Sequence, residues 1–213
     1  MRLPHPFQAP LAATERMGNP TCYLANLLLS YQHMPLAYIA LGSNLPSLAG
    51  HPDATLAAAL PQLASIGRIT ARSSLYSTAP VGIPNQPRFL NAVVLLDTVL
   101  APRTLLSALL FIERLFGRDR HAAVPNGPRT LDLDVLLYGD LILSEPGLEI
   151  PHLRLAQRAF VLVPLAEIAP NLRDPRSGLT AAKLLSNLAA AAAPAAASDP
   201  AVTPIQSPLW PPT

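Results

Sequence analysis

The sequence predicts an α/β (α+β) domain with a ferredoxin-like βαββαβ core and helices packed on the sheet. Three observations lead to this fold class. Four runs have the residue pattern of strands, two segments show signs of helices, and these six elements follow the order strand, helix, strand, strand, helix, strand. Of the 213 residues, 50% are hydrophobic, which is enough for the core of one domain of ordinary size.

The first strand and the first helix are expected in the segment before residue 62. Residues 36–41 alternate like a strand, and the run stops at the turn residues Gly42-Ser43-Asn44. A proline and an aspartate then open a helix over residues 52–60. Pro61 must end or kink this helix, because proline has no backbone N–H and clashes with the preceding turn.

The middle of the chain predicts two strands and a second helix. Residues 68–76 and 89–100 are expected to be strands, and a loop rich in proline and glycine separates them. Pro102 suits the first turn of a helix, and Gly117 closes it. Apolar residues between them recur at helical spacing: Leu105, Leu109, Ile112 and Phe116.

The last strand of the core follows a polar loop over residues 118–130. It begins near Asp132 and ends at the turn residues 138–140. A helical region over residues 155–168, interrupted by Pro164, is expected to pack afterwards.

Residues 127–134, Gly-Pro-Arg-Thr-Leu-Asp-Leu-Asp, point to chemistry on a phosphate. Side chains alternate across a strand, so Asp132 and Asp134 share one face while Leu131, Leu133, Val135 and Leu137 cover the other. Same-face neighbours lie about 6.5 to 7 Å apart, a span that can bracket one or two magnesium ions with phosphate oxygens. Arg129 can bind a phosphate with two parallel hydrogen bonds. Taken alone, however, two alternating aspartates are more often the solvated face of a strand.

Composition excludes several classes of protein. The formal net charge of +2 is too small for a general nucleic-acid coat, although arginines gather in one segment, at Arg114, Arg118, Arg120 and Arg129. Cys22 is the only cysteine, which excludes an internal disulfide and a cysteine-based metal cluster. No segment reaches about 18 apolar residues without a charge or a proline. We therefore expect a cytoplasmic protein that binds neither nucleic acid nor membrane.

The chain divides into three parts by composition. Residues 1–34 show no clear periodicity, and we interpret them as a disordered extension or as lying upstream of the true start. Residues 35–188 are the expected folded domain. Residues 189–213 are rich in alanine and proline, and we expect a disordered tail that cannot pack a core.

Two common nucleotide-binding motifs are missing. The chain has no G-x-x-x-x-G-K-[ST] phosphate loop, and no G-x-G-x-x-G follows a strand. If the protein binds a nucleotide, a metal and arginines must hold the phosphates.

Four segments taken together resemble one enzyme family. They are residues 37–44 (AYIALGSN), 76–91 (YSTAPVGIPNQPRFLN), 127–134 (GPRTLDLD) and 151–160 (PHLRLAQRAF). Their order and spacing over residues 36–170 resemble the 6-hydroxymethyl-7,8-dihydropterin pyrophosphokinases of folate biosynthesis. The resemblance implies a ferredoxin-like domain that transfers the β,γ-diphosphate of ATP to the pterin hydroxymethyl group and releases AMP.

The resemblance also implies roles for individual residues. Asp132 and Asp134 would ligate two Mg²⁺ ions that bind with ATP. The catalytic set would be these two aspartates with Arg118, Arg120 and Arg129. The pterin would be bound by Thr78, Pro80, Val81, Phe89, Asn91 and Phe160, with the two phenylalanines on either side of the ring. ATP would be bound by Glu113, Arg118, Arg129, His152 and Arg158. We expect a monomer, with contacts to other folate-pathway enzymes possible.

The chain departs from the family pattern at two places. Pro125 and Asn126 stand before Gly127, where the family often has a bulky or basic pair. Leu153 follows His152, where some members have a tyrosine. Both departures concern loop closure and ATP affinity.

Two other functions remain open at this point. Paired carboxylates on a sheet also serve nucleotidyl transferases and nucleases. Ferredoxin-like sheets also display aromatic residues that stack single-stranded bases, although aromatics are only 5% of this chain. Taken singly, Phe89 and Phe160 could be core residues, His152 a helix cap, and Arg118 and Arg120 a solvated face.

Overall fold

The structure is a computed structural model that describes residues 35–83, 85–120, 124–192 and 202–210. Pro35 begins a compact unit. Our interpretation of residues 1–34 lies outside the described residues.

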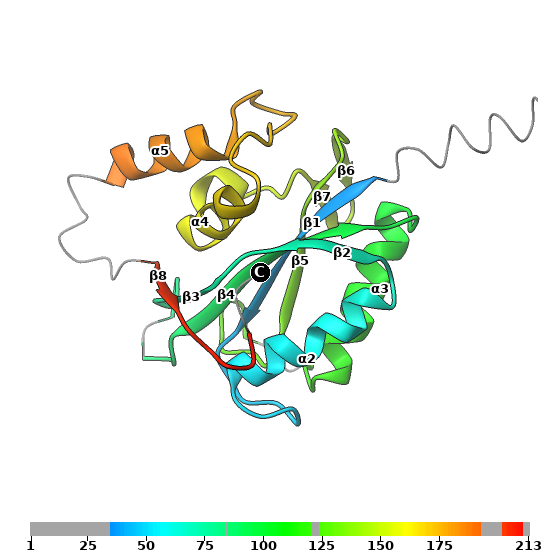
Figure 1. Ribbon diagram of the computed structural model, residues 1–213, viewed down its shortest axis with the longest axis vertical. Helices are drawn as coiled ribbons and strands as arrows, with labels where there is room; N and C mark the ends of the chain where they lie inside the picture. The colour runs from blue at the N-terminus through cyan, green and yellow to red at the C-terminus, as the bar shows by residue number, and fades with distance from the viewer. Residues whose placement is uncertain (1–34, 84, 121–123, 193–201, 211–213) are drawn as a thin grey trace, which may run out of the picture. The chain divides into compact units, whose positions relative to one another are not determined.

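The described residues form an antiparallel sheet with helices on both faces (Figure 1). The elements are β1 (Leu36–Ser43), α2 (Pro52–Ala64), β2 (Arg68–Arg72), β3 (Leu75–Thr78), β4 (Phe89–Asp97), α3 (Pro102–Leu115), β5 (Asp132–Tyr138), β6 (Leu143–Glu145), β7 (Leu148–Ile150), a 3-10 turn η1 (Leu155–Gln157), α4 (Ala159–Ile168), α5 (Ala181–Ala192) and β8 (Thr203–Ile205). The sheet order is β5-β1-β4-β3-β8, and β2 also pairs with β4. This arrangement confirms the predicted ferredoxin-like α/β fold.

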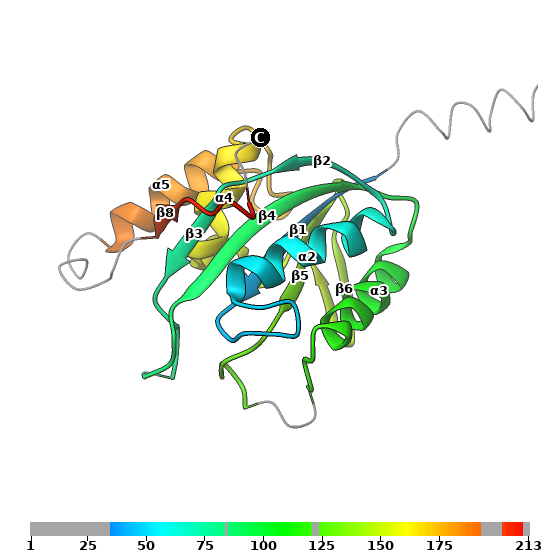
Figure 2. The same ribbon diagram turned by 60° about the horizontal axis from the view of Figure 1, so that its bottom comes forward.

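Two hydrophobic cores lie on opposite faces of the sheet. Helices α2 and α3 cover one face, and α4 and α5 cover the other, as both views show (Figures 1 and 2). Strand β1 supplies both cores by alternation, because Ile39 faces α2 and α3 while Tyr38 faces α4. The helices leave one end of the α4 face open, and that end carries the candidate site.

The aspartate strand β5 follows the predicted alternation for most of its length. Leu133 and Val135 pack in the α2/α3 core, as predicted. Leu137 packs instead in the opposite core, next to Leu136. The prediction for Leu137 was wrong because the register of β5 against β1 shifts at a bulge opposite Tyr38 and Ile39 of β1. Beyond the bulge, the side chains of β5 point to the face opposite to the one that simple alternation predicts.

Several predicted boundaries also differ from the structure, among them the ends of β1, at Ser43, and of β4, at Asp97. Helix α2 runs through Pro61 to Ala64, and the reason is packing: Leu63, beyond the proline, is fully buried. The predicted strand over residues 68–76 is divided into β2 and β3. Between them the Oγ of Ser73 accepts a hydrogen bond from the backbone N–H of Val93, and the register against β4 shifts.

The C-terminal segment differs most from the expectation of an unpacked tail. Helix α5 extends to Ala192, beyond the predicted boundary at residue 188. Strand β8 pairs with the edge of β3, beside which it runs in Figure 2. Trp210 is 4% exposed, and its Nε1 donates to the backbone oxygen of Ser73 at 2.9 Å. One large aromatic side chain thus anchors a proline-rich segment whose composition predicts none of this.

Candidate active site

Strand β1 lies between the two strands that carry the polar residues of the site. In the sheet register, Gly42 pairs with Asn91 of β4 on one side and with Asp132 of β5 on the other. One step along, Ala40 lies between Val93 and Asp134. An amide on β4 and two carboxylates on β5 therefore face the same space across two small residues.

This space is a cavity of about 510 Å³. Twelve of the predicted site residues line it: Thr78, Val81, Phe89, Asn91, Arg118, Arg120, Arg129, Asp132, Asp134, His152, Arg158 and Phe160. They come from β3, β4, β5, α4 and the intervening loops. Pro80 and Glu113 do not line the cavity, which differs from what the family resemblance implied.

Asp132 is surrounded by arginines. One carboxylate oxygen accepts from Arg118 and the other from Arg129, the latter at 2.7 Å. Arg120 lies 3.9 Å from the same carboxylate. The cavity as a whole is lined by Arg118, Arg120, Arg129, Arg154 and Arg158 against Asp132 and Asp134, with Glu113 behind it, and this surplus of positive charge suits an anionic ligand.

Glu113 lies behind the cavity and holds the arginines in place. Only 1% of it is exposed, because it sits on the buried face of α3. Its carboxylate accepts two hydrogen bonds from Arg120, both at 2.8 Å, and lies 3.5 Å from Arg118. It also accepts from the backbone N–H of Leu133, between the two aspartates. The contacts explain why Glu113 faces the arginines and not the cavity.

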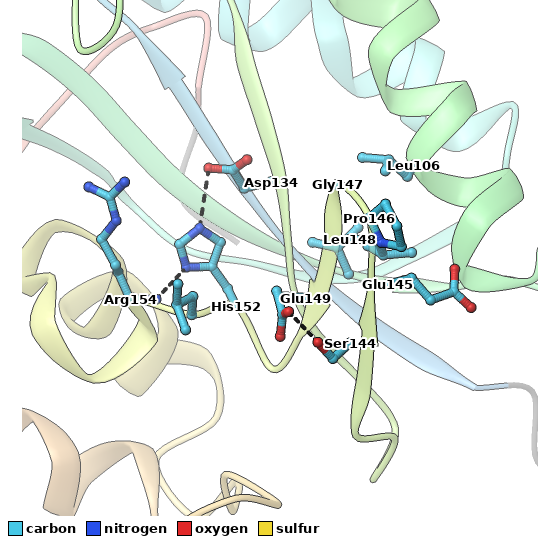
Figure 3. A pocket seen from close by; sticks show the side chains of 12 residues that line it. Leu106, Asp134, Ser144, Glu145, Pro146, Gly147, Leu148, Glu149, His152 and Arg154 are labelled. Atoms are coloured by element: carbon cyan, nitrogen blue, oxygen red, sulfur yellow. Dashed lines mark hydrogen bonds and ion pairs between the residues drawn. The ribbon is translucent and has the colours of Figure 1, made fainter.

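Asp134 is the carboxylate without an arginine in hydrogen-bonding contact. Its side chain keeps 37% of its surface, yet the surrounding protein and the charge of Asp132 raise its pKa to about 6. The Nε2 of His152 lies 4.0 Å from an oxygen of Asp134, as Figure 3 shows.

His152 is held as a neutral imidazole. Burial and the nearby Arg158 and Arg154 lower its pKa to about 4. Its Nδ1 accepts from the backbone N–H of Arg154 at 3.1 Å, so the proton resides on Nε2. His152 therefore points an N–H donor toward the carboxylate end of the cavity.

The other end of the cavity holds the amide and the aromatic rings. Asn91 is 7% exposed, and its Nδ2 donates to Thr78 Oγ1 at 2.7 Å. The guanidinium of Arg129 lies 5.3 Å from the ring centre of Phe89. The guanidinium of Arg158 lies 5.4 Å from the ring centre of Phe160. These cation–π contacts link the aromatic end to the charged end.

Asn44 connects the two loops beside the cavity, which the sequence analysis did not foresee. Its Oδ1 accepts from the backbone N–H of Arg129, and its Nδ2 donates to Gln86 and to the backbone oxygen of Pro87. Gln86 in turn donates to the backbone oxygen of Asn126. A buried amide with every hydrogen bond satisfied is a rigid connection. The sequence did place Asn44 at the end of a segment that resembles the family, residues 37–44, but this position does not reveal its contacts across the chain.

A second cavity of about 660 Å³ adjoins the first (Figure 3). The two share Asp134, His152 and Arg154. Its remaining wall comes from Leu106 of α3, Val135 of β5, Leu153 and the β6–β7 hairpin. The sequence analysis did not predict this hairpin. A ligand longer than one ring system can thus extend from one cavity into the other.

Comparison with known proteins agrees with this geometry. Residues 38–170 match the family described as 7,8-dihydro-6-hydroxymethylpterin-pyrophosphokinase (HPPK). The 2-amino-4-hydroxy-6-hydroxymethyldihydropteridine pyrophosphokinase of Pseudomonas aeruginosa is 49% identical over 140 residues, which cover 65% of this chain and 83% of the relative. The protein of the same name from Methylorubrum extorquens is 47% identical over 141 residues, which cover 65% of this chain and 85% of the relative.

A solved structure shares the fold. Wild-type HPPK-DHPS of Plasmodium falciparum has a TM-score of 0.61 at 16% sequence identity, and the match covers 78% of this chain and 47% of that chain. This chain thus spans about half the length of that protein, and at this identity the likeness concerns the fold alone. The sequence match extends over more than half of the chain. The chain belongs to the 7,8-dihydro-6-hydroxymethylpterin-pyrophosphokinase family.

Proposed function

We propose that the protein transfers the β,γ-diphosphate of ATP to the hydroxymethyl group of 6-hydroxymethyl-7,8-dihydropterin and releases AMP. Pyrophosphoryl transfer to this pterin, in folate biosynthesis, is the activity of its family. One observation carries the assignment of the site. The amide of Asn91 and the carboxylate of Asp132 face one cavity from either side of Gly42, so a pterin end and a phosphate end lie next to each other.

Asp132 and Asp134 fit a magnesium site that phosphates complete. Within the described ranges, no three histidine, cysteine, aspartate or glutamate side chains are placed to hold a metal ion by themselves. Mg²⁺ prefers oxygen ligands and is commonly held by one or two carboxylates together with substrate phosphates. Burial, followed by the charge of Asp132, raises the pKa of Asp134, and a bound cation would stabilise both carboxylates in their charged form. Two Mg²⁺ ions bound with ATP would neutralise the triphosphate and align the reacting oxygens.

The arginines would bind the phosphates and stabilise the charge that develops on them. Arg129 and Arg118 already hold Asp132, and Arg120 extends from Glu113 with 48% of its side chain exposed. Arg120 contacts Glu113 through Nε and Nη2, so a phosphate that leaves this contact in place would bind the edge of the guanidinium that carries Nη1. Such contacts act mainly by position and charge, which is the usual way in which phosphoryl transfer is catalysed.

His152 would donate a hydrogen bond to a phosphate oxygen. Its neutral state and its Nε2–H direction follow from the contacts with Arg154 and from its lowered pKa. Arg158, on the same side of the cavity, would add a positive charge.

The pterin would occupy the end of the cavity with Asn91 and Thr78. Phe89 and Phe160 line this end and would stack on either face of the flat ring. The amide of Asn91 would meet the hydrogen-bonding edge of the ring. Val81 lines the same end, and Pro80 precedes it in the loop that follows β3.

The nucleoside of ATP would occupy the second cavity. The shared wall of Asp134, His152 and Arg154 would then lie beside the phosphates. Leu106 and Leu148 offer apolar surface for a base. Glu113 would position the arginines without touching ATP.

Family membership decides against the nuclease and the nucleic-acid-binding alternatives. Among the described residues, no helix is long and apolar enough to span a bilayer. The monomeric state, the cytoplasmic location and contacts with other folate-pathway enzymes stay predictions.

AMP release from ATP by the purified protein tests the proposal. We expect AMP only when Mg²⁺ and 6-hydroxymethyl-7,8-dihydropterin are both present, and none after EDTA is added. Chromatography of the nucleotides gives the readout, and ADP formation would indicate a different phosphoryl transfer. Equal AMP release with and without the pterin would overturn the proposal.

A further inference from the structure

Strand β1 contributes two small residues to the floor of the cavity. On the face that carries the aspartates, β1 presents Ala40 and Gly42. The neighbouring strands β4 and β5 stand about 9.5 Å apart, which is two strand spacings. The result is a trough whose walls are Asn91 on one side and the aspartates on the other.

Gly42 has no conformational reason to be glycine. Several other glycines of the described residues have a positive φ angle, which favours glycine, but Gly42 does not. It lies near the end of a strand of eight residues, where glycine weakens a strand because it loses more backbone freedom on folding and packs no side chain. The backbone would therefore accept alanine at this position, and the reason for glycine must lie in the surroundings.

The surroundings of Gly42 leave little room for a side chain. A Cβ at this position would lie 3.1 Å from Asn91 Oδ1 and 3.7 Å from Asp132 Cβ. The first contact is tighter than an ordinary van der Waals contact, so the amide of Asn91 would have to move. Asn91 has little freedom to do so, because it is buried and its Nδ2 already donates to Thr78 Oγ1 at 2.7 Å.

We propose that Gly42 is a positioning residue for pterin recognition, because the missing side chain lets Asn91 hold Thr78 with Nδ2 while Oδ1 lies over β1. In this orientation Oδ1 is an acceptor for an N–H of the pterin, and the trough is deep enough for the edge of the ring. A methyl group at residue 42 turns or displaces the amide, so Oδ1 no longer meets the ring. This inference rests on the proposed placement of the pterin at the Asn91 end.

The test is Gly42→Ala in the full chain, with steady-state kinetics in both substrates. We expect KM for the pterin to rise by at least about tenfold and KM for ATP to change by less than about twofold. The melting temperature is expected to fall, because crowding against the buried Asn91 outweighs the gain from restricting the unfolded chain. An unchanged KM for the pterin, or an equal rise in both KM values, would overturn the inference.

A double-mutant cycle with Asn91→Ala separates this role from general damage to the sheet. If the methyl group acts through the amide, Gly42→Ala changes KM for the pterin by less than about twofold once Asn91 is alanine. A full additional loss in the double variant would contradict the proposal. If Gly42→Ala alone fails to fold, crowding against the Asn91 amide is the expected cause, and the double variant, which lacks this amide, should fold. Failure of both variants to fold would contradict the proposal. Wild-type turnover, measured in parallel, tests the proposed function independently of either variant.

Discussion

Asp132 is the residue on which the charged contacts of the cavity converge. Arg118 and Arg129 bind its two oxygens, and Arg120 lies within 4 Å of it. Two strand residues away, Asp134 has no such partner. The two carboxylates therefore differ in surroundings although their local sequence is alike, and burial together with the charge of Asp132 raises the pKa of Asp134.

Replacement of either aspartate should abolish turnover and leave the fold in place. Asp134→Asn keeps the size of the side chain but removes a negative charge and one metal-ligand oxygen, and we expect kcat to fall by at least about a thousandfold, or roughly 4 kcal/mol. The melting temperature should not fall, because the variant relieves the repulsion with Asp132. Near-normal turnover with saturating Mg²⁺ would remove Asp134 from the proposed metal site.

Glu113 is a buried charge whose partners are only partly buried. For Glu113→Gln we expect the free energy of unfolding to drop by about 2 to 3 kcal/mol, which is less than for a fully buried ion pair. The loss is smaller because Arg118 retains its ion pair with Asp132 and because Arg120 is half exposed. Turnover should also fall, since the arginines lose their anchor. Glu145→Gln, which removes an exposed ion pair with Arg103, is the control. Urea unfolding checks the first effect, and an equal loss in both variants would contradict it.

At the scale of elements, Glu167 joins helix α4 to strand β3. Its carboxylate accepts from the backbone N–H and the hydroxyl of Ser74 and from the hydroxyl of Tyr76. The helix that carries Phe160 is thereby connected to the strand that carries Thr78. Burial, followed by the hydrogen bond to Glu167 and its charge, raises the pKa of Tyr76 to about 12.

This link predicts how stability changes at alkaline pH. The pKa of Tyr76 is higher in the folded protein than the value of about 10 expected in the unfolded chain. The stabilising effect of its hydroxyl is therefore complete below about pH 10 and is lost as the pH rises toward 12. The difference in unfolding free energy between the wild type and Tyr76→Phe should shrink over this range in urea titrations. A difference that stays constant from pH 8 to about 12 would show that the hydroxyl does not contribute in this way.

Elements also explain which part of the site the sequence could predict. Period-two alternation is a local property, so it correctly placed Asp132 and Asp134 on one face of β5. The bulge opposite residues 38 and 39 depends on how β1 pairs with β5, and it reversed the face of Leu137. Likewise, Asn44 meets Arg129 across 85 residues of chain, a contact that no local pattern contains.

At the scale of the molecule, residues 202–210 add a strand to the sheet. This segment lies outside residues 38–170, the range that matches the family. Strand β8 covers the edge of β3, and the Oγ of Ser207 donates to Asp53 at the start of α2. Trp210 lies in the core under α2, with Arg72 over its ring at 4.7 Å. An uncovered strand edge is a site for pairing between molecules, so this segment also protects against aggregation.

Removal of the Trp210 side chain should cost stability but not chemistry. For Trp210→Ala we expect a loss of about 3 to 5 kcal/mol in the free energy of unfolding, the usual cost of a large buried aromatic. Leu209→Ala is the matched control, because Leu209 is 52% exposed and should cost less than about 0.5 kcal/mol. The kcat of the folded fraction should not change, since Trp210 does not line the cavity. Equal unfolding curves for the two variants would show that the segment contributes nothing to the fold.

The sequence by itself determined the order of the six core elements, the fold class, the family and the shared face of the two aspartates. These follow from local spacing and from motifs that stand in a particular order, both of which are present in the chain before it folds. Only the tertiary structure decided that Glu113 lies behind the arginines, that Gly42 separates Asn91 from Asp132, and that Trp210 packs a proline-rich segment onto the core. Burial and hydrogen bonding depend on residues far apart in the chain, and their pairing exists only once the sheet has formed.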